Sequence, residues 1–242
     1  MTRGEQEQKC LDKVKLLFNS CKILGLDTQD ERLFLENTLK EAEANFESSK
    51  FPDFLFADGF IEHFQVTSAN ENRKGSEFRK KQKEFQKKGD EHLKKISEET
   101  FQQCSMSFVI TSCYLEMESP CSSYENYRKS FEKNWIHHIN SRRKYSSEKT
   151  CVFLIEFVGD PIIIEKDHKF VDFYRISLDK SILNYVYKFK SDVDYVIFTY
   201  SDRCELVSVK QIPDKLIALN DNVNFGMGRQ REVNAMFVVD IS

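Results

Sequence analysis

Short, almost continuously apolar runs most constrain what this chain can fold into. Residues 151–158 and 193–200 are dense in Val, Ile and Phe, and amphipathic helix patterns lie before, between and after such runs. Strands that are apolar on both faces need helices packed above and below their sheet. The sequence therefore predicts an α/β fold, with a mixed central β-sheet flanked by helices. Because neither a linker nor an internal repeat interrupts the pattern, residues 1–242 are expected to form a single domain.

The amino-terminal part, about residues 1–48, is predicted to be helical. Leu11, Val14, Phe18 and Cys21 form the apolar stripe of a helix over residues 5–24. A capping box from Thr28 to Glu31 opens a second helix. Further helices are expected at 75–100, from 122 onward and at 177–189, and strands at 51–56, 60–67, 106–117, 151–158, 162–165, 193–200, 206–209 and 233–241. Two strand pairs are expected to form hairpins, 51–56 with 60–67 and 151–158 with 162–165.

Composition narrows the class of protein. The chain is 40% hydrophobic and 31% charged, which is typical of a globular protein. Its longest apolar runs fall far short of the ~20 residues of a membrane-spanning helix, and the first residues lack the apolar stretch of a signal peptide. The seven Cys and five His show no Cys-x-x-Cys pair and no short zinc-ligand spacing, which favours reduced core thiols. We therefore expect a cytoplasmic protein without a membrane segment, a disulfide framework or a structural zinc site.

Charge is distributed unevenly along the chain. The net charge is −3, yet residues 73–95 hold ten basic residues against four acidic ones, a net of +6, so the remainder carries −9. A basic helix over about 75–100 on an acidic protein suggests a polyanionic partner, and nucleic acid is the common one. A solvated helix face with no ligand is the alternative. The candidate nucleic-acid-binding residues are Lys74, Arg79, Lys80, Lys81, Lys87 and Lys88.

The run from Phe51 to Thr67 carries the sharpest motif. It places Pro52-Asp53 before one strand of a predicted hairpin and Glu62 and Gln65 on the next strand, after a helix that bears Glu36. This arrangement resembles the PD-(D/E)XK nuclease superfamily over roughly residues 30–100. The resemblance implies a restriction-endonuclease-like core, Mg²⁺ or Mn²⁺ as cofactor, Asp53 and Glu62 as metal ligands and catalytic residues, Gln65 as a positioning residue and Glu36 as an assisting acid. Clustered carboxylates suit such chemistry because they hold the metal against a phosphate.

The sequence departs from the motif at the lysine. Phe64 or Thr67 occupies its place, depending on whether Glu62 or Gln65 is taken as the motif acid. The hairpin register decides which side chains share a face with Asp53. A two-residue type I′ turn at Asp58-Gly59 places Asp53 opposite Phe64, whereas a three-residue loop places it opposite His63; the first is favoured because Asp-Gly suits that turn.

The sequence thus predicts a metal-dependent nuclease-like protein that hydrolyses DNA or RNA. The alternative is a catalytically inert member of the same fold that binds nucleic acid or a protein partner, and a homodimer stays open.

Three other features of the sequence give weaker indications of function. The adjacent His137 and His138 point about 100° apart on a helix and cannot share a metal. The segment 226–231 is interpreted as a turn. Glu156 is an acid inside a buried strand, which places it either at a functional cleft or beside a basic side chain, the commoner case.

Overall fold

The computed structural model describes most of the chain. The described residues are 3–45, 51–69, 108–115, 122–145, 147–166, 169–200, 202–219, 223–227 and 231–238, together with 87, 90, 91, 94, 95 and 98. They form a mixed α/β structure, as the sequence predicted. The chain divides into two compact units, the first made of Met1–Thr67, Tyr127–Val158 and Tyr174–Val223 and the second of Ser68–Asn126, Gly159–Phe173 and Asn224–Ser242. This division does not test whether the chain is a single domain, so the single domain stays a prediction.

The first unit is built on a seven-stranded mixed sheet. Its strand order is β1 (Ile23–Leu24), β10 (Arg203–Ser208), β9 (Tyr195–Tyr200), β6 (Thr150–Val158), β4 (Gly59–Thr67), β3 (Phe54–Phe56) and β2 (Glu43–Ala44). The three central strands β9, β6 and β4 run parallel, and the strands β10 and β3 beside them run antiparallel to their inner neighbours. Both edge strands have only two residues, which limits the exposed ladder that another chain could extend.

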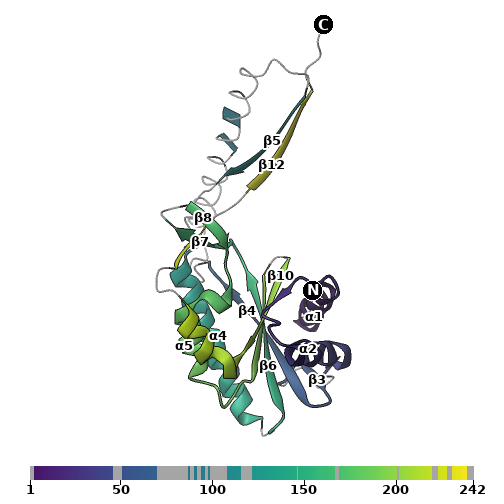
Figure 1. Ribbon diagram of the computed structural model, residues 1–242. Helices are drawn as coiled ribbons and strands as arrows, with labels where there is room; N and C mark the ends of the chain where they lie inside the picture. The colour runs from purple at the N-terminus through teal and green to yellow at the C-terminus, as the bar shows by residue number, and fades with distance from the viewer. Residues whose placement is uncertain are drawn as a thin grey trace. The chain divides into compact units, whose positions relative to one another are not determined.

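Helices cover both faces of this sheet, as Figure 1 shows. One face lies against α1 (Arg3–Asn19) and α2 (Gln29–Glu41), and the other against α4 (Tyr124–Lys144). The shorter helices are α5 (Lys180–Tyr187) and α6 (Ile212–Ala218), with 3₁₀ turns at Ile176–Leu178 and Val209–Gln211. The continuously apolar β6 is buried between these layers, which explains its lack of polar alternation.

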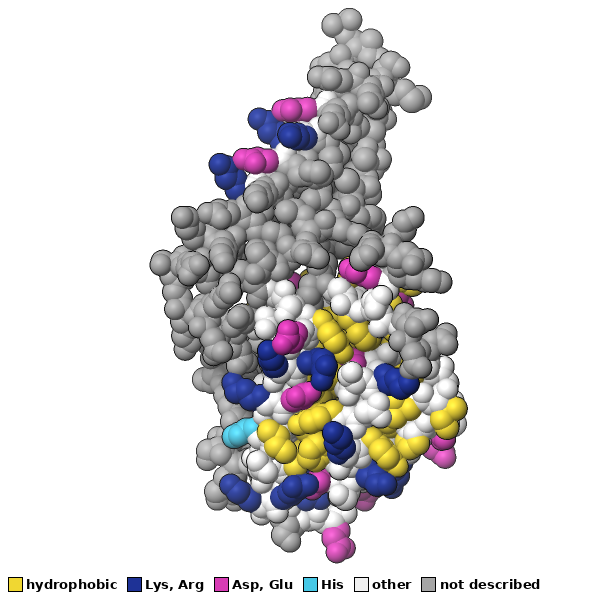
Figure 2. Space-filling model, turned by 90° about the vertical axis from the view of Figure 1, so that its left-hand side faces the viewer, with side chains coloured by type: hydrophobic (Ala, Val, Ile, Leu, Met, Phe, Trp, Pro, Cys, Tyr) yellow, Lys and Arg dark blue, Asp and Glu magenta, His cyan; other side chains and the backbone are white. Residues whose placement is uncertain are grey.

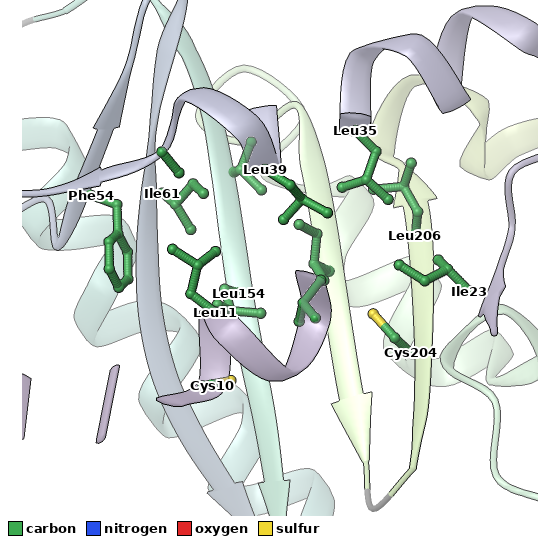
Figure 3. Close-up of a cluster of buried hydrophobic side chains, with 14 of the residues drawn as sticks. Cys10, Leu11, Ile23, Leu35, Leu39, Phe54, Ile61, Leu154, Cys204 and Leu206 are labelled. Atoms are coloured by element: carbon green, nitrogen blue, oxygen red, sulfur yellow. The ribbon is translucent and has the colours of Figure 1, made fainter. Parts of the chain in front are cut away.

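The core between the sheet and the amino-terminal helices contains aliphatic side chains from α1, from α2 and from the sheet. Leu11 of α1, Leu39 of α2 and Leu154 of β6 belong to this cluster, shown in Figure 3. The capping box of Thr28 and Glu31 is present at the start of α2, as predicted. The first helix differs from its prediction because it ends at Asn19. Cys21 has a left-handed backbone (φ 54°), so the chain turns there and residues 23–24 form β1 instead of a last helical turn.

The second unit contains two small sheets. The three-stranded sheet has the order β11 (Asn224–Met227), β7 (Ile162–Lys166) and β8 (Lys169–Phe173), and β5 (Phe108–Leu115) pairs antiparallel with β12 (Arg231–Val238). The predicted hairpin of 151–158 with 162–165 is wrong, because β6 already has parallel neighbours on both sides and β7 pairs with β8 and β11. Gly226 lies in β11, not in a turn, and a Cβ there would collide with the Glu165 carboxylate.

No helix among the described residues combines the length and the apolar character needed to cross a membrane. The basic helix predicted at 75–100 lies largely outside the described residues. Its six described positions are helical and exposed to solvent.

Candidate functional site

The hairpin of β3 and β4 carries the motif residues in a register that neither sequence alternative gave. Phe56 pairs with Gly59 and Phe54 pairs with Ile61, so the loop consists of Ala57 and Asp58. Both proposed loops were wrong because they placed Gly59 in the turn. Gly59 starts β4 instead, and a Cβ there would collide with the Phe56 ring and the carbonyl oxygen of Thr150. The glycine therefore serves close packing between strands and not a left-handed turn.

Asp53 lies one residue before β3. Extending the register by one step brings it level with Glu62 on the neighbouring strand. Its Oδ2 accepts a hydrogen bond of 2.8 Å from the backbone N–H of His63. The carboxylate of Asp53 therefore fastens the start of β3 to β4, which is a structural contribution independent of any metal.

Glu62 points toward α4, and the helix closes over it. The carboxylate is only 3% exposed, and its Oε1 shares a hydrogen bond of 2.6 Å with Nδ1 of His138. Two residues further along β4, Phe64 stacks on the His138 ring with centroids 4.5 Å apart. Trp135 of α4 and Phe153 of β6 contact Phe64 edge to face. The position that a motif lysine would take is thus filled by a buried aromatic ring.

These contacts test whether Asp53 and Glu62 suit a magnesium ion. Mg²⁺ demands octahedral oxygen coordination and usually keeps several water molecules. Glu62 lies beneath α4 with an imidazole on its carboxylate, and one oxygen of Asp53 accepts the hydrogen bond from the His63 N–H. The residues described here do not fit a hydrated magnesium ion, and we derive no step through one.

The opposite face of β4 gathers a second set of polar side chains. His63 and Gln65 point toward α1, because side chains two residues apart share a face. In the parallel pairing Gln65 lies beside Glu156 of β6, and Gln65 Nε2 donates a hydrogen bond of 2.7 Å to Glu156 Oε2. Nε2 of His63 lies 3.4 Å from the same oxygen. Glu156 therefore has one side-chain hydrogen-bond donor, Gln65, and an imidazole nitrogen at contact distance without a hydrogen bond.

Cys10 of α1 completes this cluster. One ligand atom from each of Cys10, His63 and Glu156 lies within 4.8 Å of the other two, the one such group of metal-binding residue types among the residues that the structure describes. Burial raises the pKa of the Cys10 thiol, so the thiol is protonated at neutral pH. The contacts of His63 and Gln65 lower the pKa of the Glu156 carboxyl group against the opposing effect of burial, and the half-buried Lys13 acts in the same direction. This carboxyl group is therefore ionised at neutral pH.

The remaining candidate residues from the sequence belong to neither of the two polar clusters on β4. Glu36 is exposed on α2, which packs over the face opposite to the one that Glu62 occupies. Of the six basic candidates only Lys87 is described, and its side chain is 77% exposed. The other five, Lys74, Arg79, Lys80, Lys81 and Lys88, lie outside the described residues. His137 is exposed while His138 points inward to Glu62, which agrees with the expected divergence of the two rings.

Sequence reasoning missed Cys10, His63 and His138 as members of polar clusters. A signal existed for His63, because a histidine and a glutamine lie two residues apart in strand β4 and therefore share a face. For Cys10 no local signal exists, since a cysteine in the apolar stripe of a helix resembles any core residue. The sequence predicted that His138 and His137 diverge, but the partner of His138 could not be known without the tertiary packing.

Comparison with known proteins adds no relative. No family model, no curated sequence and no solved structure matches this chain. The functional proposal therefore rests on the geometry and the charge of the chain itself.

Proposed function

We propose that this protein binds nucleic acid through the basic segment 73–95 and does not cleave it at Asp53 and Glu62. The observation that carries the second half is the closure of the motif face: Glu62 and Phe64 are buried beneath α4, with His138 in contact with both. A phosphodiester cannot reach a carboxylate in that position without displacing the helix. The proposal keeps the resemblance to PD-(D/E)XK nucleases for the fold and for nucleic-acid binding. It makes this chain a catalytically inert member of that fold.

The support for binding is the charge of the segment and the exposure of its described part. The side chains of Lys87 and Lys94 are 77% and 78% exposed. Each lies 3.7 to 3.8 Å from a glutamate one helical turn away, and exposed pairs of this kind are worth little. These lysines can therefore exchange their partners for phosphates. On the face drawn in Figure 2, the described Lys and Arg side chains lie among acidic side chains and, in the lower part of the view, apolar ones.

Hydrolysis at Asp53 and Glu62 is the second candidate. It is favoured by the register, which brings Asp53 level with Glu62 as a two-carboxylate metal site requires. Metal-dependent cleavage with Mg²⁺ or Mn²⁺ would need α4 to move away from β4. The two candidates therefore differ in one measurable product, the cut strand.

Binding is tested by fluorescence anisotropy on single-stranded DNA, duplex DNA and single-stranded RNA over a series of salt concentrations. The test variant replaces Lys80, Lys81, Lys87 and Lys88 with Gln. Each lost phosphate contact should lower the slope of log affinity against log salt by about 0.9 on a duplex and about 0.7 on a single strand. Affinity should fall on every probe alike, because phosphate contacts carry no sequence information.

The matched control makes the same charge change elsewhere. Lys9, Lys22, Lys40 and Lys210 are exposed lysines of the first unit, and their replacement with Gln should leave the slope unchanged. Equal loss in both variants would mean a general charge effect and would overturn the assignment to the basic segment. Absence of binding by the unaltered chain would overturn the proposal as a whole.

Cleavage is tested on the same probes with Mg²⁺ and with Mn²⁺. We expect intact strands. Cutting that disappears in Asp53→Asn, which keeps a side-chain oxygen to accept the hydrogen bond of the His63 N–H, would replace our proposal with the nuclease. A cytoplasmic location is also proposed, supported by the reduced state of Cys10, Cys151 and Cys204 in the core.

A further inference from the structure

We propose that Cys10, His63 and Glu156 form a zinc-binding site on the face of the sheet that lies against α1. Nothing in the proposed nucleic-acid binding requires this site, so the two proposals stand or fall separately. The first argument is the choice of ligands. A thiolate, an imidazole and a carboxylate are the three donor types that Zn²⁺ takes in proteins, and a thiolate disfavours Mg²⁺ and Ca²⁺.

The second argument is the spacing of the donors. With Zn–N and Zn–O bonds of about 2.0 to 2.1 Å, two ligands of a tetrahedral site lie about 3.4 Å apart. His63 Nε2 and Glu156 Oε2 lie 3.4 Å apart. The Cys10 Sγ lies within 4.8 Å of a ring nitrogen of His63 and a carboxylate oxygen of Glu156, against about 3.6 Å in a tetrahedral site, so binding requires the sulfur to move by at most about 1 Å.

The third argument is an unsatisfied buried nitrogen. His63 is 5% exposed, and its Nε2 lies 3.4 Å from Glu156 Oε2 without the geometry of a hydrogen bond. Buried polar atoms without a partner are costly, and most have one. The nitrogen points at the carboxylate of Glu156 and at the space shared with Cys10. A cation bonded to all three would satisfy it.

The surroundings resemble those of a supported metal site. Gln65 donates a hydrogen bond to Glu156 Oε2 and so fixes the orientation of the carboxylate, as outer residues do around metal ligands. Glu156 keeps 20% of its side chain exposed, which leaves an approach from solvent. Three protein ligands leave a fourth position for water, which is the arrangement of an open zinc site.

The sequence did not bring these three residues together, because zinc ligands were sought at short spacings. Here the three residues come from α1, β4 and β6 and are separated by 53 and 93 positions along the chain. Such a site exists only once the fold is complete. Metal binding should therefore stabilise the folded chain and not nucleate it.

Binding has a defined proton balance. The Cys10 thiol loses its proton to solvent as the Sγ–Zn bond forms, and no group is oxidised or reduced. Burial raises the pKa of that thiol, with His63, Glu156, Cys204 and the half-buried Lys13 around it. About one proton should therefore be released for each ion bound.

The test uses the full chain, freed of metal with a chelator and titrated with Co²⁺ as a spectroscopic stand-in for Zn²⁺. We expect thiolate-to-cobalt charge-transfer absorption and the visible bands of four-coordinate cobalt, both abolished by one equivalent of Zn²⁺. Cys10→Ser should remove the charge-transfer absorption. Cys151→Ser should retain it, because Cys151 is equally buried but points to the other face of β6.

Affinity for Zn²⁺ is measured by competition with a chromophoric chelator. Gln65→Ala should weaken binding by about 10- to 100-fold, and His63→Gln and Glu156→Gln should each weaken it at least as much. Should Cys10→Ser not fold, zinc X-ray absorption of the unaltered chain gives the answer, with one sulfur expected in the coordination shell. A shell without sulfur, or equal affinity for Mg²⁺ and Zn²⁺, would overturn the proposal.

Discussion

The two faces of strand β4 carry similar polar residues, but these residues are packed differently on each face. On the face toward α4, Glu62 and His138 share a short hydrogen bond, and Phe64, Trp135 and Phe153 surround them with aromatic rings. On the face toward α1, His63 and Glu156 lie at 3.4 Å with a buried nitrogen left over. The first face packs its polar pair among aromatic rings, whereas the second holds the three side chains that we propose to bind zinc.

The difference teaches that a motif acid is informative only together with its surroundings. Glu62 occupies a motif position and is buried under a helix, while Glu156 has no motif and keeps an approach from solvent. Burial of a paired carboxylate favours structure over chemistry, because substrate and metal-bound water both need space. The comparison can be broken by changes on each face in turn.

The largest effect is expected from restoring the missing motif lysine. Phe64→Lys removes a 4% exposed ring and places an ammonium group among Trp135, Phe153 and His138. Loss of the ring alone costs about 3 to 5 kcal/mol, and burying the charge adds to that. Urea unfolding should show a free energy of unfolding lower by about 4 kcal/mol or more, with no gain of nuclease activity.

Phe64→Leu separates shape from charge at the same position. It should cost only about 1 kcal/mol, because it approximately conserves apolar volume. If Phe64→Lys were as stable as Phe64→Leu, the face toward α4 would have room for solvent, and the closed state that we describe would be wrong.

The next effect concerns the short hydrogen bond on the same face. His138→Ala removes the imidazole that contacts Glu62 at 2.6 Å and stacks on Phe64, and hydrogen bonds to charged groups are worth about 1.5 to 3 kcal/mol. We expect a loss of about 2 to 3 kcal/mol in thermal or urea unfolding. The neighbouring His137→Ala is the control, since that ring is exposed and its loss should change stability by about 0.5 kcal/mol or less.

The smallest effect is a change in acid stability on the face toward α1. The contacts of His63 and Gln65 hold the pKa of the Glu156 carboxyl group below its ordinary value of 4.5 in the folded chain. Its contribution to stability is therefore complete above about pH 4.5 and is lost as the pH falls through the lower, folded value. Glu156→Gln should flatten the decline of the melting temperature below pH 4.5, and Glu36→Gln, an exposed acid, should not. If Glu156→Gln left the decline of the melting temperature below pH 4.5 unchanged, the His63–Glu156 contact would be contradicted.

The fold was predictable to the extent that its signals are local. The buried strands 151–158 and 193–200, the capping box at Thr28 and the inner face of α4 follow from short patterns in the sequence. The hairpin register could not be predicted from the sequence, because Gly59 had to be recognised as a packing residue against Thr150, 91 positions away. The Cys10 cluster was equally out of reach, since it depends on which strands become neighbours.

A crystal of this protein soaked separately in Zn²⁺ and in Mn²⁺ tests the contrast between the two faces most directly. Anomalous difference maps should show zinc within about 2.5 Å of donor atoms of Cys10, His63 and Glu156. They should show no manganese between Asp53 and Glu62. Manganese between those two carboxylates, with α4 displaced from Glu62, would contradict the account and restore the metal-dependent nuclease; zinc absent from the Cys10 cluster would remove the ligand-binding face.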